Sequence, residues 1–277
     1  MQLSLSVRIA EGFLSKEEAI LGLVDVVGIA RSAGYNALCM RASQVGVHAS
    51  SEQVSDAVHI LQSNKLAVSM LTGDFDVVYN NDRGPNALRN ITPYLRLAQQ
   101  LGAPLVRVAL KNEQDIPWAQ QAADEALAVG IKLVHQCHTL SLFETVDSMV
   151  QTLTKIDRPN FGLIYEPANL EICGQPYGPE TIAKLAPWIC NVYLQNQILR
   201  PSGKVTLNTW CRGPVSFDLI QIHEPSGIDF ATVLAGLKEI RYDGTVTVHQ
   251  SAPDGESPSD SAHATAEFLR QHITGML

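Results

Sequence analysis

Short apolar runs alternate with longer amphipathic segments along the whole chain, and this alternation restricts the fold more than any other feature. The runs have strand length and are rich in Val, Ile and Leu, and the segments between them carry apolar residues at helical spacing. Eight strands, each followed by a helix, predict an α/β fold of the (β/α)8 TIM barrel type, a single domain over residues 1–277. The predicted strands are 3–9, 36–40, 66–71, 104–110, 131–136, 161–166, 189–195 and 244–250.

The competing architecture is an open, doubly wound sheet, which shows the same alternation of strand and helix. A dinucleotide-binding sheet of that kind needs a glycine-rich phosphate loop after its first strand. The segment after residues 3–9 contains no such loop. The barrel is therefore favoured, and a length of 277 residues is ordinary for one.

Several helix ends are readable. Ser15, with Glu18 three residues later, predicts a capped helix over 15–34 that closes at Gly34. Pro93 predicts that the helix within 84–102 begins or kinks at that residue. Residues 196–228 show neither pattern, and a connection of that length indicates a functional lid or shoulder.

Composition and charge exclude several classes of protein. The net charge is −8 and there is no basic run, which disfavours a nucleic-acid binder. The sequence contains no stretch of about 18 apolar residues, so no membrane span is expected. The start "MQLSLSVRIAEG" lacks a basic region followed by a long apolar core, so no signal peptide is expected. Five scattered cysteines without a C-x-x-C pair indicate reduced thiols, and hence a cytoplasmic protein.

The chemistry of a TIM barrel sits at the carboxyl ends of its strands. In this chain those ends are unusually polar, and most of the side chains there can hydrogen-bond hydroxyl groups. They predict a pocket for a sugar or polyol, although strand ends that simply meet water are polar too. The strand-end residues are Arg41, Gln44, Asp74, Asp76, Lys111, Gln136, His138, Glu166, Asn169, Tyr193, Gln195, Asn196, His249 and Gln250.

Five motifs occur in order along the chain: "GIKLVHQCH", "NFGLIYEPANL", "ICNVYLQNQ", "IHEPSGIDF" and "YDGTVTVHQ". In this order they resemble the xylose-isomerase-like TIM barrels, a group of sugar-phosphate isomerases and epimerases, hydroxypyruvate isomerase and the endonuclease IV type of repair enzyme. The resemblance implies a divalent metal held by four side chains at the ends of strands five to eight. The family pattern for these ligands is Glu, then Asp or Glu, then His or Gln, then Glu.

On this sequence the four ligand positions fall on Gln136, Glu166, Tyr193 and His249, and the histidine that follows the strand-six acid in the family falls on Asn169. Only Glu166 keeps its chemical type. Three carboxylates and an imidazole suit Mn²⁺ or Mg²⁺, and the set found here binds such ions more weakly. Glu166 with His249, and with His138 if it swings in, still offer donors for Zn²⁺, and Gln136 is a further candidate metal ligand. Whether a Zn²⁺, Mn²⁺ or Mg²⁺ ion binds stays open at this stage.

Strand alternation separates the histidines of "GIKLVHQCH". Gln136 is the inward residue, so His135, one position earlier, is expected to be buried between strand and helix. His138 lies just past the strand and is expected to reach the site. The stretch "HEPSG" resembles a loop of hydroxypyruvate isomerase, which marks His223 and Glu224 as further candidates.

Isomerisation or epimerisation next to a carbonyl needs one group to take a proton and another to return it. Glu166 and His249 are the predicted catalytic pair, because imidazole titrates near neutral pH. Gln136 cannot transfer a proton, but its amide can hold a sugar hydroxyl or the oxygen of an enediolate. The remaining substrate contacts are expected from Arg41, His138, Asn169, Tyr193, Gln195, Asn196 and Gln250.

The predicted function is a sugar or sugar-acid isomerase or epimerase that acts through an enediolate. One alternative is a lyase or dehydratase in which Glu166 takes a proton and His249 protonates the leaving hydroxyl. Another is a metal-free carbohydrate-binding protein with an eroded catalytic site. The expected ligand is a small sugar or sugar phosphate, with Arg41 and Lys111 as candidate holders of a phosphate or carboxylate. No nucleic acid and no membrane is expected as a partner, and the chain is expected to form a homodimer.

Overall fold

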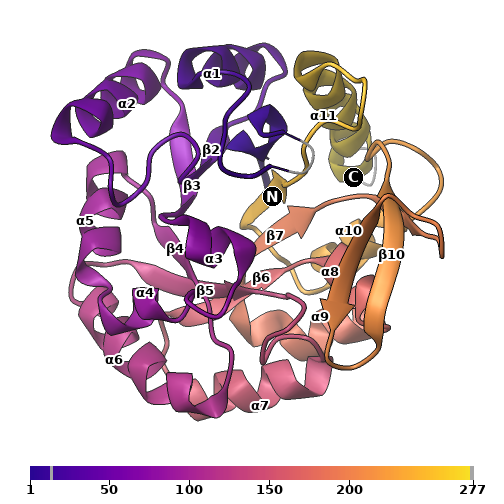
Figure 1. Cartoon of the computed structure of the whole chain (residues 1–277). Coiled ribbons are helices and arrows are strands. Elements are labelled where there is room, and N and C mark those ends of the chain that lie inside the picture. Colours follow the sequence, from indigo (N-terminus) through magenta and orange to yellow (C-terminus); the bar gives the residue numbers. More distant parts are fainter. Residues whose placement is uncertain (13–14, 275–277) are drawn as a thin grey trace.

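The computed structural model describes residues 1–12 and 15–274, and its centre is a closed barrel of parallel strands (Figure 1). The strands follow one another around the barrel in the order β1-β11-β7-β6-β5-β4-β3-β2, which confirms the predicted TIM barrel. They are β1 (Gln2–Ser6), β2 (Ala37–Arg41), β3 (Ala67–Thr72), β4 (Leu105–Val108), β5 (Lys132–Gln136), β6 (Phe161–Tyr165), β7 (Ile189–Leu194) and β11 (Thr245–Val248).

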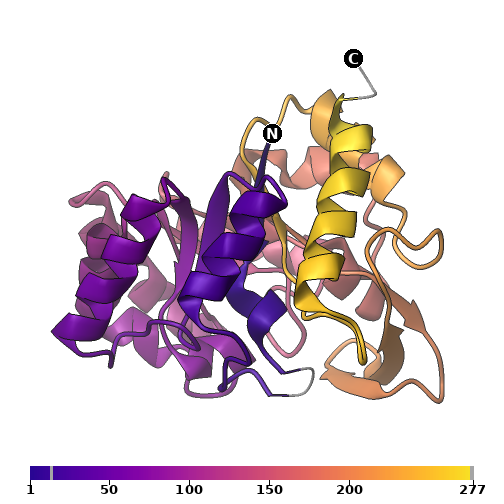
Figure 2. The same ribbon diagram turned by 90° about the horizontal axis from the view of Figure 1, so that it is seen from above.

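Helices form a ring around the barrel and bury their apolar faces against it (Figures 1 and 2). Their ends follow local residue chemistry: a reciprocal capping box between Ser50 and Gln53 begins α2, and Gly102, at φ 70°, ends α5. Within the described residues, no helix combines the length and the hydropathy that crossing a membrane requires. The helices are α1 (Leu23–Ser32), α2 (Ser51–Ser63), α3 (Phe75–Tyr79), α4 (Asn86–Arg89), α5 (Thr92–Leu101), α6 (Ile116–Leu127), α7 (Val146–Ile156), α8 (Pro167–Ile172), α9 (Pro179–Leu185), α10 (Phe230–Glu239) and α11 (Pro258–Thr274), with 3-10 turns η1 (Val7–Ala10), η2 (Glu113–Asp115) and η3 (Ala186–Trp188).

The prediction of a helix over 15–34 is wrong at its start. Helix α1 begins only after Gly22, whose extended backbone (ψ 163°) breaks the run. The segment before it turns back, and the backbone N–H of Ile20 donates to the carbonyl of Ala10 at 2.7 Å. Glycine is a poor helix former, so Gly22 is a weak point in the predicted helix. The tertiary pairing of Ile20 with Ala10 therefore prevails over the local capping signal. As a result Lys16 reaches the mouth of the barrel.

Residues 196–228 contain a second sheet, which stands off the barrel in orange in Figures 1 and 2. It has three antiparallel strands in the order β8-β10-β9: β8 (Gln197–Leu199), β9 (Val205–Thr209) and β10 (Gly213–Leu219). Alternate side chains of the β9–β10 hairpin line the cavity described below. The segment predicted as a lid or shoulder therefore covers part of the barrel mouth.

The apolar core has two parts. A large cluster fills the space between the strands and the ring of helices. A smaller one fills the barrel interior, as in other TIM barrels, and consists of Cys39, Met70, Leu105, Val134, Ile164 and Tyr193. The inner cluster closes the barrel below its carboxyl end, so the side chains above it stand on a packed floor.

Candidate active site

A cavity of about 260 Å³ lies at the carboxyl ends of the barrel strands, beneath the β9–β10 hairpin. A larger hollow of about 510 Å³ lies beside the segments 42–49 and 73–76, and three of the expected strand-end residues, Gln44, Asp74 and Asp76, line it. We place the site in the smaller cavity because buried charged and polar groups converge there. Its polar lining consists of Arg8, Lys16, Arg41, Tyr79, Arg107, Gln136, His138, Glu166, Asn169, Gln195 and His249.

Glu166 follows the fully buried strand β6 directly and precedes Pro167, the first residue of α8. Its side chain is therefore held between a rigid strand and a helix start. The amide Nε2 of Gln136 donates to Glu166 Oε2, and Asn169 Nδ2 donates to the same oxygen at 2.6 Å. Asn169 Nδ2 also donates to the carbonyl of Cys137 at 2.7 Å, which orients the amide. The carboxylate is thus held at the cavity by two amides, Gln136 at the end of β5 and Asn169 on α8.

Burial raises the pKa of Glu166 to about 7. The hydrogen bond from Gln136 and the positive charges of Arg107 and Arg8 oppose this shift and only partly offset it. A pKa near neutrality suits a carboxyl that both takes up and returns protons.

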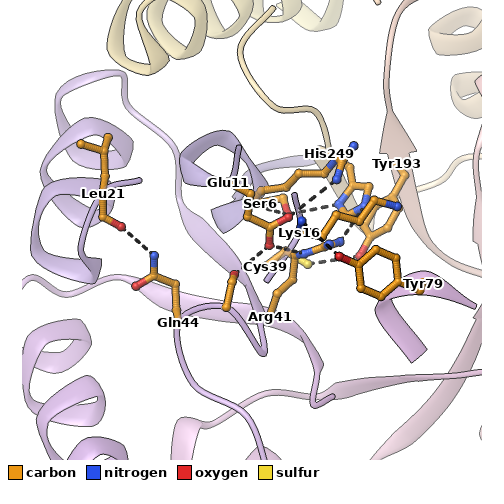
Figure 3. A network of polar contacts seen from close by, with 12 residues as sticks. Ser6, Glu11, Lys16, Leu21, Cys39, Arg41, Gln44, Tyr79, Tyr193 and His249 are labelled. Atoms are coloured by element: carbon orange, nitrogen blue, oxygen red, sulfur yellow. Dashed lines mark hydrogen bonds and ion pairs between the residues drawn. The ribbon is translucent and has the colours of Figure 1, made fainter. Parts of the chain in front are cut away.

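His249 directly follows β11, and its ring contacts Arg41, Ser6 and Tyr193. Its Nε2 lies 3.2 Å from Nη1 of Arg41, and its Nδ1 lies 3.1 Å from the hydroxyl of Ser6 (Figure 3). A guanidinium can only donate, so Nε2 accepts and Nδ1 carries the hydrogen. The ring stacks on Tyr193 with centroids 3.7 Å apart. Burial, followed by the charge of Arg41, holds the pKa of His249 well below its usual value, so the imidazole is neutral.

A cluster of arginines surrounds these groups. Arg41 Nε donates to Glu11 Oε1 at 2.7 Å (Figure 3). The hydroxyl of Ser43 donates to the same oxygen. Arg8 Nη1 lies 3.6 Å from the other oxygen of Glu11. Glu11 is therefore shared between two arginines and neutralises only one of them.

Arg107, on β4, lacks a comparable partner. Its side chain is buried, its Nε has no hydrogen-bond acceptor, and no carboxylate of the described residues lies within 4.0 Å of it. Nη2 of Arg41 and Oε1 of Gln136 are likewise buried without a partner. Burial lowers the pKa of Arg107 to about 10, and that of Arg8 to about 10 as well.

Three of these cations were not anticipated from the sequence: Arg8, Arg107 and Lys16. A signal existed for the two arginines, because each interrupts an otherwise apolar strand-like run, "LSVRI" and "LVRVAL". A charged residue inside such a run has to face either a polar site or solvent. No comparable signal marked Lys16, which reaches the cavity only because the predicted first helix starts late.

The structure gathers most of the residues expected at the site. Arg41, Gln136, His138, Glu166, Asn169, Gln195 and His249 line the cavity.

The other expected residues lie off the cavity wall. Gln44, Asp74 and Asp76 line the larger hollow, and Lys111 Nζ donates to the carbonyl of Asn80 at 2.7 Å.

Tyr193 belongs to the inner cluster beneath His249, and its hydroxyl contacts Cys39 Sγ at 3.3 Å. Asn196 Nδ2 donates to the carbonyl of Gln221 at 2.9 Å, and Gln250 Oε1 accepts from the backbone N–H of Asn196 at 2.8 Å. Asn196 and Gln250 therefore anchor the loop after β10 and do not face a ligand.

The histidines separate as strand alternation predicts. His135 is buried and stacks on Phe143 with centroids 3.9 Å apart, on the helix side of β5. Burial lowers its pKa to about 3. His138 lines the cavity with Nδ1 3.2 Å from Asn80 Nδ2. His223 is exposed and lies outside the cavity lining.

A sequence profile of the xylose isomerase-like TIM barrels matches residues 27–272. The chain belongs to this family. No curated protein sequence matches it.

Solved structures with the same fold include proteins that are named for different activities. D-psicose 3-epimerase with D-tagatose from Clostridium cellulolyticum H10 is 13% identical, with a TM-score of 0.73 and 99% of each chain covered. The probable 3-DHS dehydratase AsbF from Bacillus anthracis is 15% identical, with a TM-score of 0.70 over 97% of this chain and 98% of that one. A xylose isomerase-like protein from Mycobacterium smegmatis in complex with magnesium is 14% identical, with a TM-score of 0.71 over 99% and 97%. At such identities the likeness shows the fold alone.

The donors at the family's metal positions do not suit a divalent cation in this chain. The acceptor nitrogen of His249 faces the guanidinium of Arg41, and two amide N–H groups occupy one oxygen of Glu166. Tyr193 points into the inner cluster. Arg107 also lines the cavity, so an added M²⁺ ion would stand among guanidinium groups, with Glu166 as the carboxylate of the cavity lining and Glu11 already paired with Arg41 and Arg8.

One other group of metal-type donors exists among the described residues. Ligand atoms of Glu144, Cys173 and Cys211 lie within 4.8 Å of one another, beside the tip of the β9–β10 hairpin. The carboxylate of Glu144 is already used: it accepts the backbone N–H groups of Leu140, Trp210 and Cys211 at 2.5–3.0 Å. This group holds the hairpin tip against the barrel.

Proposed function

We propose that the chain is a carbohydrate isomerase or epimerase in which Glu166 transfers the proton next to the carbonyl. The observation that carries the proposal is the buried carboxyl of Glu166, with a pKa of about 7, in a polar cavity at the barrel mouth. A general base works best when its pKa is close to the working pH. The family, and the likeness in fold to a sugar epimerase, support the reaction class.

The side chains around Glu166 take complementary roles. Gln136 and Asn169 hold the carboxylate, and the free Oε1 of Gln136 can accept a substrate hydroxyl. Positively charged side chains at the cavity wall favour the negative charge that develops in an enediolate. His249 is neutral and its acceptor nitrogen is bonded to Arg41. The contacts of His249 therefore indicate that it positions Arg41, and they do not favour proton transfer by its imidazole.

A carboxyl with a pKa near neutrality also supports a lyase. It can take a proton next to a carbonyl and return one to a leaving hydroxyl. The similar fold of a probable dehydratase agrees with this second candidate. The two reactions differ in product, because only the lyase releases water and leaves a double bond.

The test is exchange of substrate protons with deuterium, followed by NMR over a panel of ketoses and sugar acids, for the wild type and for Glu166→Gln. The variant keeps the shape of the side chain, so exchange should slow by roughly 10²–10⁴, the usual worth of a positioned general base. Glu171→Gln is the matched control, since this carboxylate lies on α8 outside the cavity lining and should leave exchange unchanged.

Unchanged exchange in Glu166→Gln would refute the assignment. Loss of water from the substrate would favour the lyase. Binding without any exchange in the wild type would favour a carbohydrate-binding protein. The homodimer and the cytoplasmic location stay predictions, and light scattering at micromolar concentration tests the dimer.

A further inference from the structure

The cavity holds more positive charge than the chain itself neutralises. Three arginines, Arg8, Arg41 and Arg107, line it, and among the described residues two carboxylates, Glu11 and Glu166, lie with them. Glu11 is committed to Arg41 and Arg8, and the raised pKa of Glu166 makes it a weak counter-charge at neutral pH. Buried charges without partners are costly, so folded proteins normally pair them.

The unused donors are specific atoms on two adjoining arginines. Nε of Arg107 and Nη2 of Arg41 are buried and lack acceptors, and both side chains line the same cavity. Their exposures are 2% and 1%, so bulk water does not solvate these guanidinium groups freely. A guanidinium presents a planar set of donors that matches two oxygens of a carboxylate or phosphate. Two arginine side chains that line one cavity, with donors that the described residues leave without acceptors, point to an anionic ligand.

The size of the cavity limits what that anion is. A volume of about 260 Å³ is small for a ligand pocket, so the cavity fits a small molecule and not a polymer chain. The remaining lining offers amides from Gln136, Asn169 and Gln195, which suit hydroxyl groups. The hairpin adds Leu207 and Phe217, which cover the ligand from one side.

We propose that the ligand is a polyhydroxy compound with a carboxylate or phosphate group, and that Arg107 and Arg41 bind this group in place of the family's divalent metal. The inference rests on the proposed function for the place of the ligand, but it concerns binding and not turnover. It follows that binding needs no divalent ion. It also follows that a neutral sugar is a poor ligand, because it leaves the charge of Arg107 without a counter-charge.

Three probes with one six-carbon polyol chain separate the possible sources of charge: D-gluconate, D-sorbitol 6-phosphate and neutral D-sorbitol. Each is titrated calorimetrically into the wild-type protein in excess EDTA. We expect at least one anionic probe to bind tenfold or more tighter than sorbitol, a difference worth about 1.4 kcal/mol. Preference for gluconate identifies a sugar acid, and preference for the phosphate identifies a sugar phosphate.

Variants of Arg107 test whether its guanidinium causes the preference for an anionic probe over sorbitol. Arg107→Met should abolish the preference for the anion, and Arg107→Lys should keep part of it. Arg96→Met, at an exposed arginine of α5, is the control and should bind like the wild type. Glu166→Gln should keep the preference even though its exchange slows, which separates failure of this inference from failure of the proposed reaction.

The inference is overturned if sorbitol binds as tightly as both anions, or if none of the three probes binds. It is also overturned if the preference survives in Arg107→Met, or if it appears only after Mn²⁺ or Mg²⁺ is added back. The comparison of probes in the wild type needs no variant, so poor folding of Arg107→Met leaves the test intact.

Discussion

Two buried charges in this protein have opposite surroundings. Glu144, 3% exposed, receives backbone N–H groups from its own loop and from the hairpin tip. Arg107, 2% exposed, has a buried Nε without an acceptor. A buried charge whose hydrogen bonds are all made with the backbone stabilises the structure. A buried charge with unmade hydrogen bonds destabilises the fold until a ligand pairs with it. The comparison therefore separates structural from ligand-binding charges.

The strongest test of this comparison uses two arginines of the same cavity. Arg41→Met leaves the carboxylate of Glu11 buried with a weaker set of partners, so the free energy of unfolding should fall by roughly 3–5 kcal/mol. Arg107→Met removes a charge without a close carboxylate. The free energy of unfolding should therefore fall by less than about 1 kcal/mol, or rise. Urea unfolding followed by circular dichroism measures both. Adding Glu11→Gln to Arg41→Met should restore part of the loss, and equal losses in the two single variants would break the comparison.

The pH dependence of stability tests the surroundings of Glu166. Its pKa in the folded protein, about 7, lies above the ordinary value of 4.5, so the folded state binds more protons than the unfolded state between these values. The free energy of unfolding should therefore fall as the pH rises from about 4.5 to 7, by roughly 3 kcal/mol from this group. Urea midpoints measured across that range, in the wild type and in Glu166→Gln, isolate the contribution. The same slope in both proteins would contradict the raised pKa.

The structural charge should show its worth at the hairpin. Glu144→Ala removes the acceptor of three backbone N–H groups, and we expect a loss of roughly 2–3 kcal/mol, since hydrogen bonds to charged groups are the stronger ones. Limited proteolysis should also cut the β9–β10 hairpin faster. Glu224→Ala is the control: that exposed side chain accepts one backbone N–H, from Gln221, and should matter less. Equal cleavage rates in the two variants would show that Glu144 does not hold the hairpin.

The smallest effect is expected beneath the cavity. Tyr193→Phe removes a hydroxyl whose one contact is the thiol of Cys39 and keeps the ring that stacks on His249. Stability should fall by about 1 kcal/mol, and binding of the anionic probes should stay within about twofold of the wild type. A tenfold loss of binding would mean that the phenol acts on the ligand after all.

Several features of the site could be read from sequence because they depend on strand position alone. Gln136 and Glu166 end neighbouring strands, and parallel strands bring their carboxyl ends to one rim. Glu166 and Asn169 are also close along the chain, so their contact is partly local. Tyr193 was expected at the cavity but lies below it, because strand position does not tell how deep in the barrel a side chain ends.

The amino-acid sequence by itself determined the alternation of strands and helices, the stop of α5 at Gly102 and hence the barrel, since these signals act over a few residues. Only the tertiary structure decided the late start of α1, the sheet formed within 196–228 and the partners of each buried charge. The physical reason is distance along the chain: His249 and Ser6, which are hydrogen-bonded, stand 243 positions apart. Closure of the barrel alone brings such groups together, and it alone buries Arg107 with its Nε lacking an acceptor among residues 1–12 and 15–274.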